Sequence, residues 1–138
     1  MPDFRLECIE IVYRIVVKRS WLEDDGTLKP EAFLIMREAD ALKGLSVQRA
    51  CLCTAEQCKS KVRSGFGVDS LQVGRIGRLD LEVWHHEPDD EDHAGIMGLP
   101  PYYRKADLTL SEIARAEDLA GRLAAQARPQ LRRRWRAE

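Results

Sequence analysis

The sequence predicts a single α+β domain. We expect a mixed or antiparallel sheet of four to five strands, with a short helix and a C-terminal helix packed on one face. The chain has 138 residues, the length of one ordinary domain. Apolar residues alternate in several short segments, and one long segment near the C-terminus repeats them every three or four positions. The domain is expected to span residues 1–128, followed by a basic C-terminal tail at 129–138.

The composition is typical of a globular protein in water, with 44% hydrophobic residues, 33% charged residues and a formal net charge of -1. This balance indicates no particular class of partner. No apolar stretch approaches the roughly 20 residues that a membrane helix requires, and the opening MPDFRLECIE lacks the basic and then apolar run of a secretory signal. We therefore expect a cytoplasmic protein with reduced cysteines.

Three segments predict strands. Residues 8–18, CIEIVYRIVVK, place apolar side chains at every second position and read as an internal strand. A shorter extended piece is expected within GLSVQRACLCT, residues 44–54. The preceding segment AFLIMRE is expected to be irregular to extended. Residues 67–84, GVDSLQVGRIGRLDLEVW, predict two strands, or one strand broken by a bulge at Gly74 to Gly77.

Two capping-box spacings predict helices. Thr54-x-x-Gln57 would open a short helix that runs to about residue 62. Thr109-x-x-Glu112 would open a helix from about 110 to 127, and we expect Ile113, Ala120 and Leu123 to face the sheet from it. Pro129 would end this helix.

Two clusters of potential metal ligands stand out, and we predict no bound metal at either. His85, His86 and His93 flank an acidic run, but adjacent residues of an extended chain point to opposite faces, and the run lacks the spacing of a calcium loop. Cys51-x-Cys53-x4-Cys58 matches no common zinc pattern, so small buried side chains are expected there. The sequence names no cofactor.

His93 is the histidine that we single out. It ends the acidic run and directly precedes the apolar segment AGIMGLP, so we expect it to be packed and hydrogen-bonded, with His85 and His86 more exposed to water. Such an imidazole could act as a general acid or base or bind a phosphate. The alternative is a structural hydrogen bond to a backbone carbonyl.

Arg14 and Ser46 complete the candidate catalytic set. Arg14 lies in the middle of a very apolar strand, where it needs either an anionic ligand or a carboxylate on a neighbouring strand. Ser46 lies in GLSV without the G-x-S-x-G pattern of a serine hydrolase, which argues against a nucleophile.

The tail carries a basic cluster around a tryptophan. Its arginines could neutralise phosphates of a nucleic acid while the indole stacks on a base, or they could dock on the acidic loop. Disorder is the third alternative. The candidate binding residues are Arg132, Arg133, Arg134, Trp135 and Arg136.

The order of YRIV, AFLIMREADALKGLSV, TAEQC, SLQVGRI, DLEV and EPDDEDHAGIMGLP, over roughly residues 12–100, resembles a loose group of small uncharacterised bacterial hypothetical proteins. Their pattern is an arginine-bearing first strand, Ala-Phe, Leu-Ser-Val and His-Ala-x-Ile, and it implies no activity. More remotely, the arginine strand with the following Ser-Val strand and helix resembles the opening of the RES class of ADP-ribosyltransferase-like toxins, which consume NAD. Arg14 and Ser46 would match that class's arginine and serine/tyrosine motifs, whereas its glycine-rich NAD loop is missing here.

Two functions follow as expectations. In the first, the chain is a small non-catalytic component of a bacterial operon, of toxin–antitoxin or defence type, that binds a protein partner encoded nearby or a nucleic acid. In the second, it is a small nucleotide-directed enzyme, ADP-ribosyltransferase-like or a nuclease, that uses Arg14 and His93. Convergence of Arg14, Ser46 and His93 in one cleft would favour the enzyme.

Overall fold

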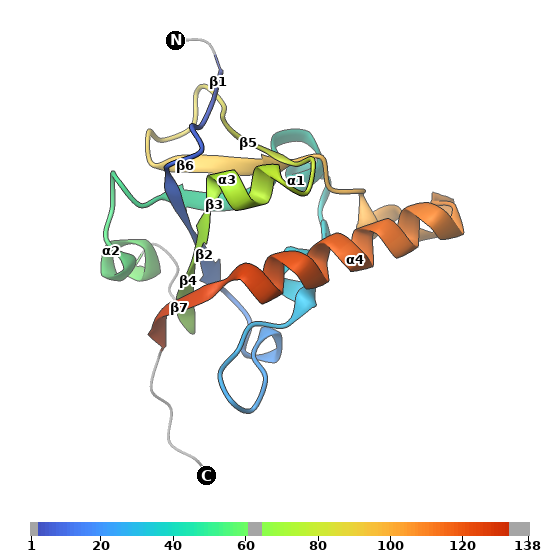
Figure 1. Cartoon of the computed structure of the whole chain (residues 1–138), viewed down its shortest axis with the longest axis horizontal. Coiled ribbons are helices and arrows are strands. Elements are labelled where there is room, and N and C mark those ends of the chain that lie inside the picture. The colour runs from blue at the N-terminus through green and yellow to red at the C-terminus, as the bar shows by residue number, and fades with distance from the viewer. Residues whose placement is uncertain (1–2, 61–64, 133–138) are drawn as a thin grey trace.

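The protein is a single α+β domain built on one antiparallel sheet, as a computed structural model that describes residues 3–60 and 65–132 shows (Figure 1). The class was predicted correctly, but the strand number was too low, because the sheet of the described residues has seven strands in the order β1-β5-β6-β3-β2-β4-β7. The strands are β1 (Phe4–Arg5), β2 (Ile11–Val16), β3 (Leu45–Arg49), β4 (Gly67–Gln72), β5 (Glu82–His85), β6 (His93–Met97) and β7 (Arg128–Arg132).

Both predicted capping boxes are present. The Thr54 hydroxyl accepts from the Gln57 backbone at 3.1 Å, and the Gln57 side chain accepts from the Thr54 backbone at 2.8 Å. Thr109 and Glu112 repeat this arrangement. The helices are α1 (Glu38–Lys43), α2 (Ala55–Ser60), α3 (Val73–Gly77) and α4 (Leu110–Gln126), with 3-10 turns η1 (Arg19–Trp21), η2 (Pro30–Phe33) and η3 (Tyr102–Asp107).

Of the two alternatives for residues 67–84, the prediction of two strands was correct, since β4 and β5 lie there, and one strand with a bulge at Gly74 to Gly77 was wrong. The segment Val73–Gly77 forms α3, which connects β4 to the turn before β5. The side chains of Val73 and Ile76 in this helix are buried. Two apolar residues three positions apart suit one face of a helix, and the glycines are tolerated because the helix is so short.

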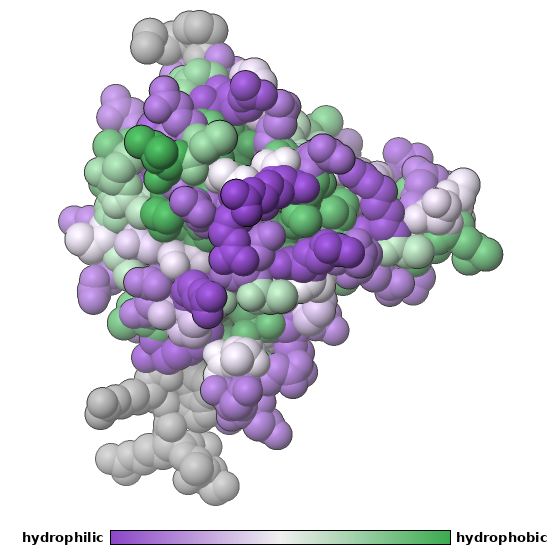
Figure 2. Space-filling view, viewed as in Figure 1, coloured by the Kyte–Doolittle hydropathy of each residue, from purple (hydrophilic) through white to green (hydrophobic). Residues whose placement is uncertain are grey.

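The main core lies on one face of the sheet. α4 packs against η2 and buries Leu119, Ala120 and Leu123 there, whereas Ile113, expected to face inward, is only half-buried. On the opposite face α2 covers a smaller cluster made of Ile15, Cys53, Ala55, Cys58 and Val68. The outward side of the molecule around α4 is mostly hydrophilic (Figure 2).

The predicted tail boundary falls at the start of a strand. Residues 128–132 form β7, which pairs with β4 at one edge of the sheet, so this part is not a tail. Gly67 permits the close approach, because a Cβ there would lie 2.6 Å from the Leu131 carbonyl oxygen. Arg132 forms an ion pair with the buried Asp69. The remaining tail residues, Arg133, Arg134, Trp135 and Arg136, lie outside the described residues.

β2 and β3 separate along their length, and this separation positions the candidate site. Their register covers only Val12 with Arg49 and Tyr13 with Gln48. Beyond Tyr13, β2 stays paired with β4 as far as Val16, while β3 stays paired with β6 back to Leu45. The two strands therefore diverge beyond Tyr13, and we call the region between their diverging ends the fork. Within the described ranges, no helix is long and apolar enough to cross a membrane.

Candidate functional site

Ser46, His93 and Asp89 form a hydrogen-bonded relay beside this fork. The Ser46 Oγ lies 2.9 Å from His93 Nε2, and His93 Nδ1 lies 3.0 Å from Asp89 Oδ2. The second carboxylate oxygen, Asp89 Oδ1, accepts from Lys43 Nζ at 2.9 Å. A hydroxyl, an imidazole and a carboxylate connected in this order match the pattern of an activated nucleophile, its base and the group that orients the base.

The strands place Ser46 and His93 on one face of the sheet. In the register of β3 and β6, Ser46 lies opposite Gly95 and Gln48 lies opposite His93. The side chains at positions 46 and 93 are therefore diagonal neighbours, within reach of a hydrogen bond. Glycine at position 95 is required, because a Cβ there would lie 1.9 Å from the Lys43 carbonyl oxygen at the end of α1.

The loop between β5 and β6 brings the carboxylate to the ring. The Asp89 backbone donates to the His86 carbonyl at 2.9 Å, and the His93 backbone donates to the Asp90 carbonyl at 2.9 Å, so two short turns fold the acidic run. The hydrogen bond from Lys43 is the main cause that lowers the pKa of Asp89, opposed by burial and helped by the charge of His93. Asp89 is therefore ionised at neutral pH.

This geometry selects one tautomer of the neutral His93 ring. An ionised carboxylate only accepts hydrogen bonds, so Nδ1 must carry the proton that points at Asp89. Nε2 is then left as an acceptor, and the Ser46 hydroxyl donates to it. The lone pair of Nε2 is thus aimed at the serine proton, as general-base catalysis requires.

The predicted contrast between the three histidines was wrong. His85 is the most buried of them at 2% exposure, under the ring of Phe4, and its Nδ1 bonds to the His93 carbonyl oxygen at 2.9 Å. His86 Nδ1 bonds to Asp3 Oδ2 at 2.8 Å. His93 is held by its relay as expected, but its side chain remains 25% exposed. The reason is long-range packing: the short strand β1 covers His85.

Arg14 is buried in the fork and bridges its two sides. Its Nε and Nη2 donate to the Ala32 carbonyl oxygen at 3.0 and 2.8 Å, and its Nη1 donates to the Ser46 carbonyl oxygen at 2.9 Å. The guanidinium also lies 4.9 Å from the ring centre of Trp21. Burial lowers the pKa of Arg14 to about 10, so the side chain stays cationic at neutral pH.

The predicted alternative partner of Arg14, a carboxylate on a neighbouring strand, is engaged elsewhere. Asp69 of β4 lies opposite Arg14 in the register but pairs with Arg132 of β7. The ion pairs of the described residues include none between Arg14 and a carboxylate.

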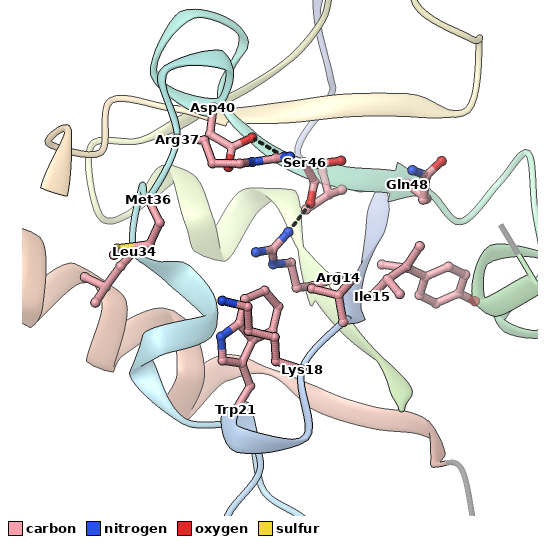
Figure 3. Close-up of a pocket in the computed structure, with 13 residues that line it drawn as sticks. Arg14, Ile15, Lys18, Trp21, Leu34, Met36, Arg37, Asp40, Ser46 and Gln48 are labelled. Atoms are coloured by element: carbon pink, nitrogen blue, oxygen red, sulfur yellow. Dashed lines mark hydrogen bonds and ion pairs between the residues drawn. The ribbon is translucent and has the colours of Figure 1, made fainter. Parts of the chain in front are cut away.

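A cavity of about 500 Å³ opens in the fork (Figure 3). Arg14 and Ser46 both line it, and Figure 3 shows the guanidinium pointing at Ser46 while the ion pair of Arg37 and Asp40 lies nearby. His93 is not among its lining residues, and it is connected to the cavity only through its hydrogen bond to Ser46. The lining residues are Tyr13, Arg14, Ile15, Val17, Lys18, Trp21, Leu34, Met36, Arg37, Asp40, Ser46, Val47 and Gln48.

The structure therefore connects the three catalytic candidates. Ser46 is the common element, since its hydroxyl bonds to His93 and its carbonyl oxygen to Arg14. Asp89 and Lys43 were missed at the sequence level. The four-residue spacing of Asp89 and His93 was a signal for the former, whereas Lys43 comes from a distant helix that no local pattern relates to the loop.

None of the four cysteines forms a disulfide. Cys53 and Cys58 are buried as expected, but Cys8 and Cys51 are exposed. Cys51 Sγ contacts Glu10 Oε1 at 3.5 Å, and burial together with this carboxylate raises the pKa of its thiol. In the part of the chain that the structure describes, no three histidine, cysteine or carboxylate side chains are grouped to hold a metal ion.

Comparisons of the chain with models of protein families, with curated proteins and with solved structures find no match.

Proposed function

We propose that the chain is a small hydrolase that acts through a covalent intermediate on Ser46. The observation that carries the proposal is the pair of hydrogen bonds through His93, 2.9 Å from Nε2 to Ser46 and 3.0 Å from Nδ1 to Asp89. Burial of the ion-paired carboxylate and the turns around it hold the imidazole in one orientation. A positioned base of this kind contributes typically 10²- to 10⁴-fold to a rate.

In the proposed reaction, Ser46 Oγ attacks the electrophilic centre of an ester while its proton passes to His93 Nε2. The bond to the leaving alcohol breaks, and the alkoxide takes the proton from His93. Water then attacks the Ser46 ester, giving one proton to His93 Nε2, and the serine oxygen recovers that proton as the acid departs. One ester and one water thus become one acid and one alcohol. Asp89 stabilises the imidazolium formed in both steps.

The roles assigned from the sequence change in this proposal. Ser46, which lacked the expected motif, becomes the nucleophile, His93 is the general base, and Asp89 is a positioning residue. Arg14 contacts Ser46 through its carbonyl oxygen, so it fixes the strand that carries the nucleophile. The expectation of a nucleotide-directed enzyme that uses Arg14 and His93 remains a prediction within this class.

The other expectation, a non-catalytic operon component that binds a protein or nucleic acid partner, also stays a prediction. Four of the five tail residues on which it depends lie outside the described residues. Arg132, the fifth, is engaged with Asp69 and with the Gly26 carbonyl oxygen at 3.0 Å. Any nucleic-acid contact by Arg132 would compete with its ion pair to Asp69 and its hydrogen bond to Gly26.

A fluorophosphonate probe tests the proposal, because it phosphonylates a serine whose hydroxyl is activated and releases fluoride. Intact-mass and peptide mass spectrometry should locate the adduct on Ser46. Ser46→Ala and His93→Ala should abolish labelling, and hydrolysis of p-nitrophenyl acetate and p-nitrophenyl phosphate identifies the preferred acid part. Ser70→Ala is the matched control, since Ser70 is a half-buried strand serine without a histidine partner in the described bonds. A folded protein that stays unlabelled would contradict the proposal and favour the non-catalytic function.

A further inference from the structure

We propose that the cavity in the fork binds the phosphate group of an organic phosphate, with Arg14 as its central ligand. This names the substrate class of the proposed hydrolase and rests on that function in so far as the ligand is a substrate. The binding itself depends only on the cavity.

The first argument is the buried charge of Arg14, which forms no ion pair with a carboxylate of the described residues. Buried charges in proteins are normally paired with an opposite charge. Arg14 is 8% exposed, yet its partners are two carbonyl oxygens, and the one carboxylate opposite it in the sheet, Asp69, belongs to Arg132. A guanidinium has five N–H donors, of which these bonds use three. Two donors are left, and among the described residues the positive charge is offset only by the Trp21 ring and by the more distant Asp40, which is itself paired with Arg37. An anion in the cavity would complete both.

The second argument is the charge of the remaining lining. Lys18 and Arg37 are exposed and line the same cavity. Asp40 is the one carboxylate among the lining residues, and it forms an ion pair with Arg37 at 3.2 Å. Three cationic side chains therefore surround a space that holds one anionic group. Phosphate carries up to two negative charges and three acceptor oxygens, and arginine forks recognise it in preference to neutral groups.

The third argument is an acceptor without a donor. Gln48 is 8% exposed and lines the cavity, and its Oε1 has no hydrogen-bond partner among the described atoms. A buried amide oxygen in this state destabilises the fold unless a ligand or water satisfies it. The oxygen itself is fully buried, so a hydroxyl group of a bound molecule would satisfy it only if the amide turned toward the cavity.

The size and lining of the cavity indicate that the ligand is larger than a free phosphate ion. About 500 Å³ lies within the usual range of small-molecule pockets. Trp21 offers an aromatic ring and Leu34 and Met36 offer apolar surface, which a phosphate ion would leave uncovered. The organic part of the ligand is expected to contact these three side chains, with the phosphate on Arg14 (Figure 3).

The test measures binding to the Ser46→Ala variant, so that no turnover consumes the ligand. AMP, adenosine and inorganic phosphate are titrated by calorimetry, and the Arg14 Nε–H and Trp21 indole N–H signals are followed by NMR. AMP is expected to bind at least tenfold more tightly than adenosine and than inorganic phosphate, with both signals shifted. Its affinity should fall as salt is raised.

Cavity variants and matched controls make the result specific. Lys18→Gln and Arg37→Gln should each raise the AMP Kd about two- to fivefold, the range expected for one exposed charge. Lys105→Gln and Arg104→Gln should leave it unchanged, since Lys105 lies outside the cavity and Arg104 forms a similar exposed ion pair with Asp107.

Two outcomes would overturn the inference. Equal affinities for AMP and adenosine would mean that the phosphate is not recognised, and an AMP Kd insensitive to both cavity variants would place binding elsewhere. In either case Arg14 would serve only to bridge the two strands. Binding of AMP without any labelling of Ser46 in the parent chain would contradict the hydrolase and leave the phosphate site intact. Labelling of Ser46 without AMP binding would support the hydrolase and contradict the phosphate site.

Discussion

Lys43 Nζ and Asp89 Oδ1 lie 2.9 Å apart, so the last residue of α1 is bonded to the carboxylate that orients His93. The other oxygen of the same carboxylate holds the ring. The side chain of Asp89 is 19% exposed and that of Lys43 is 47% exposed, so water screens the pair in part. This contact makes the electrostatics of the relay dependent on a residue outside it.

The lowered pKa of Asp89 predicts a loss of stability in acid. Because the folded-state pKa lies below the ordinary value of 3.8, ionised Asp89 stabilises the fold above that value, and this contribution is lost as the pH falls through the folded pKa. Lys43→Gln should move this loss of stability to higher pH, since it removes the hydrogen bond that does most to lower the pKa of Asp89. Urea unfolding between pH 3 and 7 measures this. Lys105→Gln is the control, and identical pH profiles for both variants would contradict the prediction.

Gly95→Ala is expected to destabilise the fold by about 3 kcal/mol or more, because overpacking against backbone cannot be relieved by a rotamer change. The added Cβ would meet the Lys43 carbonyl oxygen at 1.9 Å. Gly77→Ala, where nothing lies within 4 Å, should leave stability unchanged or raise it slightly. Thermal unfolding compares the two. A Gly95 variant as stable as the parent would show that α1 can move away from β6.

Arg132→Leu should cost about 3 to 5 kcal/mol, because it leaves the carboxylate of Asp69 buried without its countercharge. Asp69 is 1% exposed, and neither of its oxygens has a hydrogen bond within the described structure. The double variant Asp69→Leu, Arg132→Leu should lose less than the two single variants combined. Denaturant unfolding of all four proteins gives the coupling energy. An Arg132→Leu variant as stable as the parent would mean that the ion pair with Asp69 does not stabilise the fold.

Leu123→Asp should destabilise the domain by several kcal/mol, since it puts an unpaired charge in place of a fully buried side chain of α4. Leu110→Asp on the same helix should be nearly neutral. Leu110 is 86% exposed and lies in the first turn, where a negative charge is favoured by the helix dipole. Melting temperatures measured by circular dichroism distinguish the two. Equal melting temperatures would mean that α4 is peripheral to the core.

Local signals predicted the starts of α2 and α4 correctly because their physics is local. A threonine and a glutamine or glutamate three residues apart satisfy each other's backbone groups wherever the chain places them, so Thr54 and Thr109 could be read directly. β7 could not be read in this way. It contains Pro129 and arginines, which are poor strand signals, and it exists because β4 offers a free edge.

The site shows the same division. Arg14 and His93 could be selected because each is a polar residue next to apolar chain. Ser46 could be selected as a candidate, but its role could not be predicted, because that role depends on β6 placing His93 diagonally across from it. Asp89 reaches the ring through turns of the loop, and Lys43 through the end of α1. Their contribution depends on contacts between distant parts of the chain, which no single segment encodes.

The outermost strands of the sheet, β1 and β7, are its first and its last in chain order. During synthesis β4 is therefore translated well before the strand that covers its outer edge, and its hydrogen-bonding groups remain open until residues 128–132 leave the ribosome. The central strands that carry Ser46 and Arg14 face no such delay, because all of their sheet neighbours precede α4 in the chain. The half of the domain that holds the relay can thus assemble before β7 has been made, whereas the β4 edge closes only once β7 is available.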